Sequence, residues 1–399
     1  MKNLLFVDDE PKVLQGLQRQ LHAMRHEWNM TFAGGGKQAL DFMAANPVDV
    51  IITDMMMPEM DGSQLLTEVT KRHSNTVRIV LSGHADRESV LRLIGPAHQY
   101  LAKPCNAEEL RNAIARAVAL RDLLCNEQLK QLATRVKCLP SLPALHHQLT
   151  AEFQKDEPST ERIGEIISRD IGMTTKILQL VNSAFFGLPQ PISNPTDAVL
   201  YLGLTTVRSL VLSLQVFSQF DQKLNRCFSL DTLAHHCWMT GVVARRVAEA
   251  EQAGLKMRDQ CFLAGLLHDV GQLILATGLP DEYLKVMELA KSQNLPVSQA
   301  EQEHFGATHA GVGAYLLGLW GLPNPVIEAV ALHHCPSSCV VPEFSPVIAV
   351  HVADAFVHEQ LGTNTELPPP VMDLAHLTRL GLAGRIESWR TVGLGGEEF

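Results

Sequence analysis

The chain has 399 residues, with 43 Asp and Glu against 33 Lys and Arg, so its formal net charge at pH 7 is −10. A chain of this length is expected to form two or three domains, each able to bury its own hydrophobic core. The acidic balance argues against a protein that binds the nucleic-acid backbone, so direct DNA binding is not expected.

The N-terminus and the longest apolar run favour a cytoplasmic protein that spans no membrane. The first residues lead directly into Leu4 without a signal-peptide pattern, and the apolar run 200–217 includes Arg208 and several hydroxyl side chains. That run predicts a buried core helix. The eight Cys form no Cys-x-x-Cys pair and are expected to be reduced thiols.

Five short apolar runs alternate with amphipathic stretches in the first part of the chain. The runs are 4–7, 30–33, 50–53, 77–81 and 100–102. This alternation is typical of a doubly wound α/β domain with a five-stranded parallel sheet of the flavodoxin-like kind. We expect this domain to span residues 1–122.

Polar residues follow the ends of these strands. Asp8 and Asp9 follow the first run, Asp54 the third, Ser82 the fourth and Lys103 the fifth. Ligands of such sheets bind at the carboxyl ends of the strands, so these side chains are expected to meet at one edge. Converging carboxylates repel one another unless a hard cation lies among them, and Mg²⁺ is the usual one. In this arrangement Asp54 is a carboxylate nucleophile, while Ser82 and Lys103 stabilise a phosphoryl group.

The motifs at these positions resemble the full set of the response-regulator receiver domain. They are Val7-Asp8-Asp9-Glu10, Asp54-Met55-Met56-Met57-Pro58, Leu81-Ser82-Gly83-His84-Ala85 and Tyr100-Leu101-Ala102-Lys103-Pro104. The resemblance implies that Asp54 accepts a phosphoryl group from a cognate histidine kinase. It also implies that Mg²⁺ is bound by Asp8, Asp9, Asp54 and the carbonyl of Met56, that Ser82 and Lys103 bind the phosphoryl group, and that Tyr100 is the switch residue. The alternative is a receiver fold that has lost phosphorylation.

A helical linker is expected over residues 123–137. A three-and-four spacing of apolar residues continues past the last receiver helix, and no Gly or Pro occurs before Pro140; the apolar residues are Leu120, Leu124, Leu129, Leu132 and Val136. An unbroken helix here could pair two chains into a homodimer and carry a rotation to the following domain. The alternative is an ordinary amphipathic helix packed on its own domain.

Residues 138–399 show helical periodicity almost throughout, with Gly and Pro between segments, and predict an all-α domain. Several of its motifs resemble, in order, those of the HDOD family, an HD-related helical output domain that is often attached to receivers and usually regarded as non-catalytic. These motifs are Leu139-Pro140-Ser141-Leu142-Pro143, Ile167-Ser168-Arg169-Asp170, Leu180-Val181-Asn182-Ser183-Ala184 and Ala198-Val199-Leu200-Tyr201-Leu202-Gly203. The resemblance implies an output that acts by binding a downstream signalling protein or a nucleotide ligand.

His268 and Asp269 lie next to each other inside the apolar segment 262–274. A buried pair of this kind requires a metal or a polar network. The wider HD phosphohydrolase superfamily, which includes the HD-GYP phosphodiesterases, binds metal through such residues on separate helices. That resemblance identifies the ligands in this chain as His236, His268, Asp269, His309, His333, His334 and Asp354. Imidazole and carboxylate ligands suit a mono- or dinuclear centre of Fe, Mn or Zn.

Two departures from the HD-GYP pattern concern the substrate. Gln272 stands where that family has Lys, and Cys335-Pro336-Ser337 follows His334 where that family has a Gly-Tyr-Pro loop. Two functions therefore stay open: a response regulator whose output binds a partner without catalysis, or a phosphorylation-gated metal phosphohydrolase acting on a cyclic dinucleotide or another nucleotide. The alternative to a metal site is a polar core of hydrogen-bonded side chains.

Overall fold

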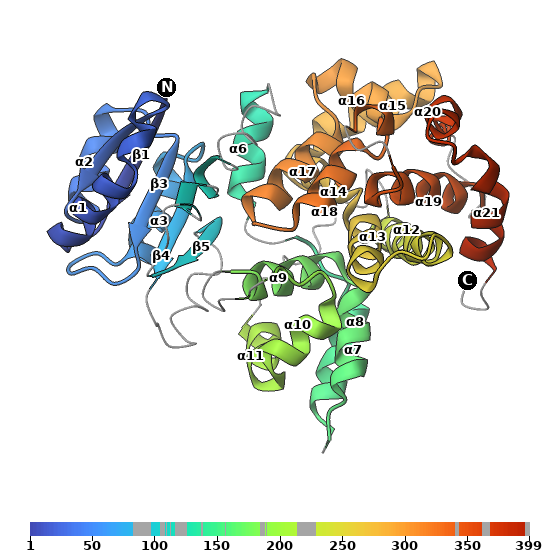
Figure 1. Ribbon diagram of the computed structural model, residues 1–399, viewed down its shortest axis with the longest axis horizontal. Helices are drawn as coiled ribbons and strands as arrows, with labels where there is room; N and C mark the ends of the chain where they lie inside the picture. Colours follow the sequence, from blue (N-terminus) through green and yellow to red (C-terminus); the bar gives the residue numbers. More distant parts are fainter. Residues whose placement is uncertain are drawn as a thin grey trace. The chain divides into compact units, whose positions relative to one another are not determined.

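The computed structural model of the chain describes residues 1–82, 97–103, 108, 110–111, 113–115, 126–136, 139–155, 157–183, 188, 190–213, 229–339, 343–360 and 368–395 (Figure 1). The chain divides into two compact units, and apart from two short segments the division falls between Lys137 and Cys138. The first unit contains a parallel sheet, and the second is built of helices.

A five-stranded parallel sheet forms the first unit. Its strands are β1 (Lys2–Val7), β2 (Trp28–Ala33), β3 (Val50–Asp54), β4 (Val77–Ser82) and β5 (Gln99–Ala102). Neighbouring strands all pair in parallel, in the order β2-β1-β3-β4-β5. The predicted doubly wound α/β sheet is confirmed, and each predicted strand is present with ends that differ by at most two residues.

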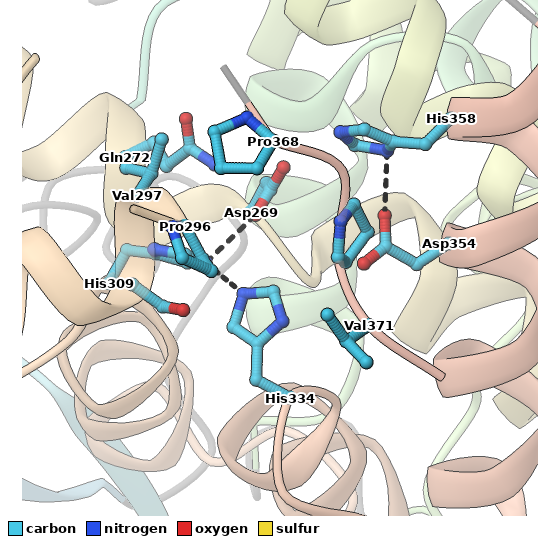
Figure 2. Close-up of a pocket in the computed structure, with 12 residues that line it drawn as sticks. Asp269, Gln272, Pro296, Val297, His309, His334, Asp354, His358, Pro368 and Val371 are labelled. Carbon is cyan, nitrogen blue, oxygen red and sulfur yellow. Dashed lines mark hydrogen bonds and ion pairs between the residues drawn. The ribbon is translucent and has the colours of Figure 1, made fainter. Parts of the chain in front are cut away.

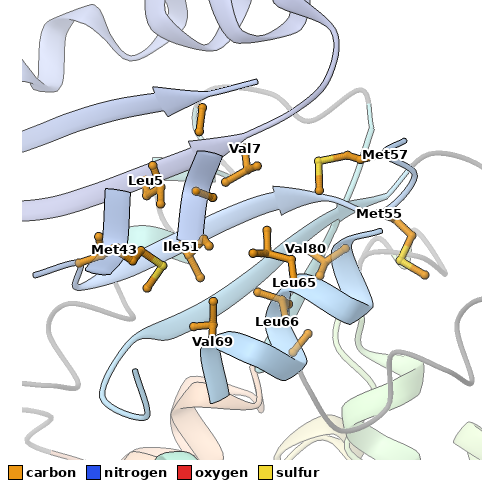
Figure 3. Close-up of a cluster of buried hydrophobic side chains, with 14 residues drawn as sticks. Leu5, Val7, Met43, Ile51, Met55, Met57, Leu65, Leu66, Val69 and Val80 are labelled. Carbon is orange, nitrogen blue, oxygen red and sulfur yellow. The ribbon is translucent and has the colours of Figure 1, made fainter. Parts of the chain in front are cut away.

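Helices α2 (Gly36–Ala45) and α3 (Gly62–Arg72) pack on this sheet, while α1 (Pro11–Gln20) and a 3-10 turn, η1 (His22–His26), connect its first two strands. Figure 3 shows the buried cluster that joins α2 and α3 to the strands, with Met43 from α2, Leu65 from α3 and Ile51 from β3. Burying each such side chain contributes about 1.5–3 kcal/mol to folding.

The turn between β3 and α3 holds the residues that follow Asp54. A Cβ on Gly62 would lie 2.2 Å from the backbone oxygen of Asp54, so this close approach requires glycine. The Asp61 carboxylate accepts a hydrogen bond from Gln64 N, and the Gln64 side chain accepts one from Asp61 N. This capping box starts α3 and stabilises the turn behind Asp54.

Helix α6 (Glu127–Arg135) starts at its own N-cap in the linker region. Asn126 has an extended backbone, and its side chain accepts hydrogen bonds from two amides of the first turn. The predicted unbroken helix is therefore wrong at Asn126, because this short polar side chain satisfies the free amides of a new helix. Leu129 is fully buried, while Leu120 and Leu124 lie outside the described residues.

A buried arginine connects β4 to the last turn of α6. Arg78 Nη2 donates a hydrogen bond to the carbonyl of Thr134 at 2.8 Å, and Arg78 N donates to His98 Nδ1 at 3.1 Å. Burial, together with the adjacent Arg78 charge, holds the pKa of His98 well below its ordinary value. His98 is therefore neutral, and the one cation in this contact lies at the C-terminal end of α6, where a helix favours positive charge.

The second unit is helical, as predicted for residues 138–399. Its helices are α7 (Pro143–Phe153), α8 (Thr160–Ser168), α9 (Ile171–Val181), α10 (Pro195–Leu202), α11 (Leu204–Ser213), α12 (Leu230–Ala250), α13 (Leu255–Leu267), α14 (Val270–Gly278), α15 (Pro280–Gln293), α16 (Val297–Phe305), α17 (His309–Leu319), α18 (Asn324–Leu332), α19 (Pro346–Gln360), α20 (Leu374–Arg379) and α21 (Ile386–Leu394), with 3-10 turns η4 (Pro336–Ser338) and η5 (Ala383–Arg385).

Helices α12, α13 and α19 pack together in this unit (Figure 1). A Cβ on Gly265 of α13 would lie 2.6 Å from the Cα of Gly241 on α12, so two facing glycines permit this close crossing. The apolar stretch Leu255–Gly278 is long enough to cross a membrane, yet 83% of its most apolar window is buried, as in a core helix. Of the apolar run 200–217, the structure describes residues up to 213, most of which form α11.

Candidate phosphoacceptor site and candidate metal centre

Three of the predicted phosphoacceptor residues meet at the carboxyl edge of the sheet. Lys103 Nζ lies 2.7 Å from Asp8 Oδ2 and also forms an ion pair with Asp54 Oδ1. Asp8 and Asp54 are only 2% and 7% exposed. Two buried carboxylates this close to one ammonium form a compact charged cluster, which is stable only while its charges are paired.

The surroundings of Asp54 keep its carboxylate oriented. Its Oδ2 accepts a hydrogen bond from the backbone N–H of Met56 at 2.7 Å. Burial lowers the pKa of Lys103, but the hydrogen bonds and charges of Asp54 and Asp8 outweigh it, so the net shift is upward and the ammonium stays charged. Asp54 can therefore interact with a positive charge on one side and a backbone donor on the other.

The remaining predicted receiver residues lie around this cluster. Asp9 is exposed beside Asp8, which supplies a third carboxylate to the same edge. Oxygen ligands of this kind are what Mg²⁺ prefers, so the donor set fits the expected ion. The structure describes the backbones of Ser82 at the end of β4 and of Tyr100 in β5, and the predictions for their side chains lie outside the described atoms.

The seven residues predicted as metal ligands all come together in the second unit, from five different places in the chain. His236 lies on α12, His309 begins α17, and Asp354 lies on α19. The adjacent pairs lie where helices end: His268 and Asp269 join α13 to α14, while His333 and His334 directly follow α18. All but His334 are less than 9% exposed.

Gly271 explains how two of these elements reach each other. A Cβ at this position would lie 1.9 Å from the backbone oxygen of His309, so no other residue fits between the start of α14 and the start of α17. This contact brings Asp269 to within 3.1 Å of the His309 ring, measured from Oδ1 to Nε2 (Figure 2). The glycine of the His-Asp-Val-Gly motif thus sets the separation of two candidate ligands.

Four donor atoms form a first subset of the cluster. His236 Nε2 lies 3.2 Å from His268 Nε2, 3.2 Å from Asp354 Oδ1 and 3.8 Å from Asp269 Oδ2. His268 Nε2 lies 3.3 Å from Asp269 Oδ2 and 3.6 Å from Asp354 Oδ1. With bonds of about 2.1 Å to a central metal, adjacent donors lie about 3.0 Å apart in an octahedron and about 3.4 Å in a tetrahedron. The five distances fit one cation at this position.

A second subset surrounds the other oxygen of Asp269. Its Oδ1 contacts His309 Nε2 at 3.1 Å, and His309 Nε2 lies 3.1 Å from His334 Nε2. Donor atoms of His309, His333 and His334 all lie within 4.8 Å of one another. Asp269 therefore faces the first subset with Oδ2 and the second with Oδ1, so each of its oxygens could serve a cation in one of the two subsets.

Buried polar atoms without hydrogen bonds support the fit of a metal. Within the described part of the chain, His333 Nε2 and Asp354 Oδ1 are buried and have no hydrogen-bond partner. An unsatisfied buried polar atom costs about 1–3 kcal/mol, and native proteins contain few of them. Both atoms belong to the two subsets, so a cation at each position would satisfy them.

The charges of the metal-free cluster are distributed over the same side chains. Burial alone would lower the pKa of His268, but the carboxylates of Asp269 and Asp354 hold it well above its ordinary value. Burial and the neighbouring imidazoles hold the pKa of His333 well below its ordinary value. A proton on His268 thus balances the buried carboxylates, and a bound cation would have to displace it.

Two residues outside the predicted ligand set orient the cluster. Glu301 on α16 is fully buried, and its Oε2 accepts hydrogen bonds from His309 N at 2.7 Å and from His309 Nδ1 at 2.6 Å. His351 Nδ1 lies 2.6 Å from the carbonyl of His333, and its Nε2 accepts from Asp373 N. A carboxylate behind a metal-binding imidazole fixes the ring and increases its basicity. Glu301 belongs to none of the sequence motifs described above, so its contact with His309 is visible only in the structure.

A pocket of about 190 Å³ opens beside the cluster (Figure 2). Five candidate or neighbouring polar side chains reach its wall, namely Asp269, His309, His334, Asp354 and His358, and Gln272 and Ser298 also line it. Pro296, Val297, Pro368, Pro370 and Val371 form the apolar part of the wall. Among these lining residues there is no Lys or Arg.

Comparison with protein families identifies the two domains of the chain. Residues 4–115 match the response regulator receiver domain, and residues 139–336 match the HDOD domain. The chain is a receiver–HDOD response regulator. The receiver match includes Asp8, Asp54 and Lys103, whereas Asp354 lies beyond the end of the HDOD match.

Relatives of this receiver–HDOD protein share parts of it. An uncharacterized protein of Treponema pallidum is 27% identical over 228 residues, which are 55% of this chain and 43% of the relative. Response regulator GtcR of Aneurinibacillus migulanus is 32% identical over 148 residues, or 36% of this chain and 59% of the relative. The chain thus spans less than two thirds of these curated relatives. The crystal structure of the MmoQ response regulator from Methylococcus capsulatus is 23% identical, covers 63% of this chain and 97% of that one, and has a TM-score of 0.50, which shows a similar fold.

Proposed function

We propose that a histidine kinase phosphorylates this response regulator on Asp54 and thereby changes the activity of its HDOD domain. The observation that supports this is the convergence of Asp54, Asp8 and Lys103 at the carboxyl edge of the sheet. A carboxylate held beside a cation and a backbone donor is a nucleophile whose phosphorylated form is stabilised by the same groups.

The neighbouring residues have distinct roles in this proposal. Asp8, Asp9, Asp54 and the Met56 carbonyl hold Mg²⁺, which supplies positive charge to the incoming phosphoryl group when bound. Lys103 contacts Asp54 now and moves its contact to a phosphoryl oxygen after transfer. The Ser82 hydroxyl donates to another phosphoryl oxygen, and Tyr100 changes position with it, as the receiver pattern implies. The altered surface then changes homodimer formation or the exposure of the output domain.

A direct test of this proposal is labelling with acetyl phosphate. Asp54→Asn removes the nucleophile and keeps the shape of the side chain, so it should abolish acid-stable Mg²⁺-dependent phosphorylation. Asp41→Asn changes an exposed carboxylate on α2 and serves as the matched control, with labelling expected at the wild-type level. Undiminished labelling of Asp54→Asn would exclude Asp54 as the phosphoacceptor.

For the output, we propose binding of a signalling protein or a nucleotide-like ligand by the HDOD domain. The pocket supports this, because it combines polar side chains with an apolar wall. The lining residues include no Lys or Arg, and Gln272 stands where the HD-GYP family has Lys, so the protein side chains offer little to hold a large anionic dinucleotide.

A second candidate function is a metal-dependent phosphohydrolase, and the ligand distances favour it. His236, His268, Asp269 and Asp354 would hold one Fe, Mn or Zn ion, and Asp269, His309, His333 and His334 a second. Such ions supply a water of lowered pKa and a positive charge for a phosphodiester. In this candidate function, Asp269 would contribute to both metal positions, and the Glu301 carboxylate holds the His309 ring in its orientation.

Metal analysis separates the two functions. Purified protein should contain metal that is lost in His268→Ala and in Asp269→Ala, whereas His304→Ala, on the surface, should keep it. Protein without metal would exclude the phosphohydrolase. Metal-loaded protein would then be assayed on cyclic di-GMP and on a generic phosphodiester, with and without phosphorylation of Asp54.

A further inference from the structure

His358 faces the first metal position from a place in the chain that lies beyond the HDOD match. It follows Asp354 by one turn of α19, and residues at this spacing lie on the same face of a helix. His358 Nδ1 lies 3.2 Å from Asp354 Oδ1 (Figure 2). The His358 ring also meets the ring of His236 edge to face, with centroids 4.5 Å apart.

The contact between His358 and Asp354 is close in distance but does not have the geometry of a hydrogen bond. Within the described residues, neither His358 Nδ1 nor Asp354 Oδ1 has a hydrogen-bond partner. Three imidazole nitrogens surround Asp354 Oδ1, at 3.2 Å from His236, 3.6 Å from His268 and 3.2 Å from His358. Nitrogen and oxygen atoms that lie this close without a hydrogen bond between them have the separation expected of two ligands of one ion.

We propose that His358 Nδ1 is an additional ligand of the first metal position, beside His236, His268, Asp269 and Asp354. This inference rests on the proposed metal centre and adds a residue to it. The 3.2 Å separation from Asp354 Oδ1 equals the two shortest separations within the first subset. An imidazole nitrogen is also the ligand type that Fe, Mn and Zn share.

The position of His358 has a consequence for the pocket. His358 lines the pocket together with Asp269 and Asp354, whereas His236 and His268 do not. Its side chain is 28% exposed, so it lies between the first metal position and the pocket. A fifth protein ligand leaves the first position at most one open site in six-fold coordination. A ligand that enters the pocket would therefore reach metal mainly at the second position, beside His309 and His334.

The test uses Co²⁺ titration of the full-length chain, followed by visible absorption and by competition with a chelator. In His358→Ala, one Co²⁺ should bind at least about tenfold more weakly, and its absorption should intensify because the coordination number falls. His235→Ala removes an exposed imidazole next to His236 and is the matched control, with wild-type binding and spectrum expected. Circular dichroism of each variant verifies the fold.

Each outcome decides between the two proposals. Wild-type binding and an unchanged spectrum in His358→Ala, beside loss of metal in His268→Ala, would overturn the assignment of His358 and leave the metal centre in place. A wild-type chain that binds no Co²⁺ would overturn both. Loss of phosphodiester hydrolysis in His358→Ala with unchanged Co²⁺ binding would instead identify His358 as a proton-transfer residue and reject it as a ligand.

Discussion

Glu301 provides a sharp test of how the second metal position is built. The residue is fully buried on α16, and three donors point at its carboxylate: His309 N at 2.7 Å, His309 Nδ1 at 2.6 Å and the Tyr283 hydroxyl at 3.1 Å. Glu301→Gln keeps the size and removes the charge. The amide oxygen can still accept from His309, and the amide nitrogen can donate to the Tyr283 oxygen, so the fold should persist.

The expected loss follows from the strength of charge-assisted hydrogen bonds. A hydrogen bond to a charged group contributes about 1.5–3 kcal/mol and a neutral one about 0.5–1.5, so Glu301→Gln should lower the free energy of unfolding by about 1–2 kcal/mol. Removing the carboxylate behind a ligating imidazole typically lowers metal affinity about 10–100-fold. The second metal should weaken by this factor, while the first, held by His236 and His268, should change little.

The assay is a Mn²⁺ or Co²⁺ titration combined with urea unfolding of the metal-free chain. Glu282→Gln is the matched control, because Glu282 also pairs with a histidine, His304, at 2.9 Å, but on the surface. Its effects on metal affinity and stability should be close to zero. Equal metal affinities for Glu301→Gln and Glu282→Gln would refute the role of Glu301 in orienting His309.

Three further predictions concern other parts of the chain. Gly62→Ala should lower the free energy of unfolding in urea by about 1–3 kcal/mol and slow acetyl phosphate labelling, because its Cβ would meet the Asp54 backbone. Gly16→Ala, with open space around it, should change neither, and equal effects of the two variants would contradict this explanation. The depressed pKa of buried His98 means that the unfolded chain binds a proton below about pH 6.5 and the folded one does not. The free energy of unfolding should therefore have its full value above that pH and fall by up to about 1.4 kcal/mol per pH unit below it. His98→Gln should make this pH dependence weaker, and an unchanged pH dependence would exclude His98 as its cause. Gln272→Lys adds a cation to the pocket, so calorimetry should show severalfold tighter binding of inorganic phosphate, and unchanged affinity would argue against an anion site there.

Local sequence patterns predicted most of the first unit correctly. The five apolar runs became five parallel strands, and Asp8, Asp54 and Lys103 met because the carboxyl ends of parallel strands share one edge. The error at Asn126 was also local: an Asn followed by Glu is a helix start signal, and the apolar spacing through the linker concealed it.

For the candidate metal centre, some residues could be predicted from the sequence and others only from the tertiary structure. The seven ligand types and their order were visible in the sequence, and His358 could have been suspected from its position one helical turn after Asp354. Glu301 could not, because its burial and its contact with His309 arise only when α16 packs beside the start of α17.

The sequence by itself determined which side chains are candidates for chemistry and which secondary structure presents them, because both depend on neighbouring residues and short periodicities. Only the tertiary structure decided that Asp269 faces two groups of ligands with its two oxygens and that His333 Nε2 lacks a hydrogen bond. These features depend on separations of a few tenths of an ångström between helices far apart in the chain. Such separations are set by packing, for example where Gly271 permits the backbone of His309 to approach.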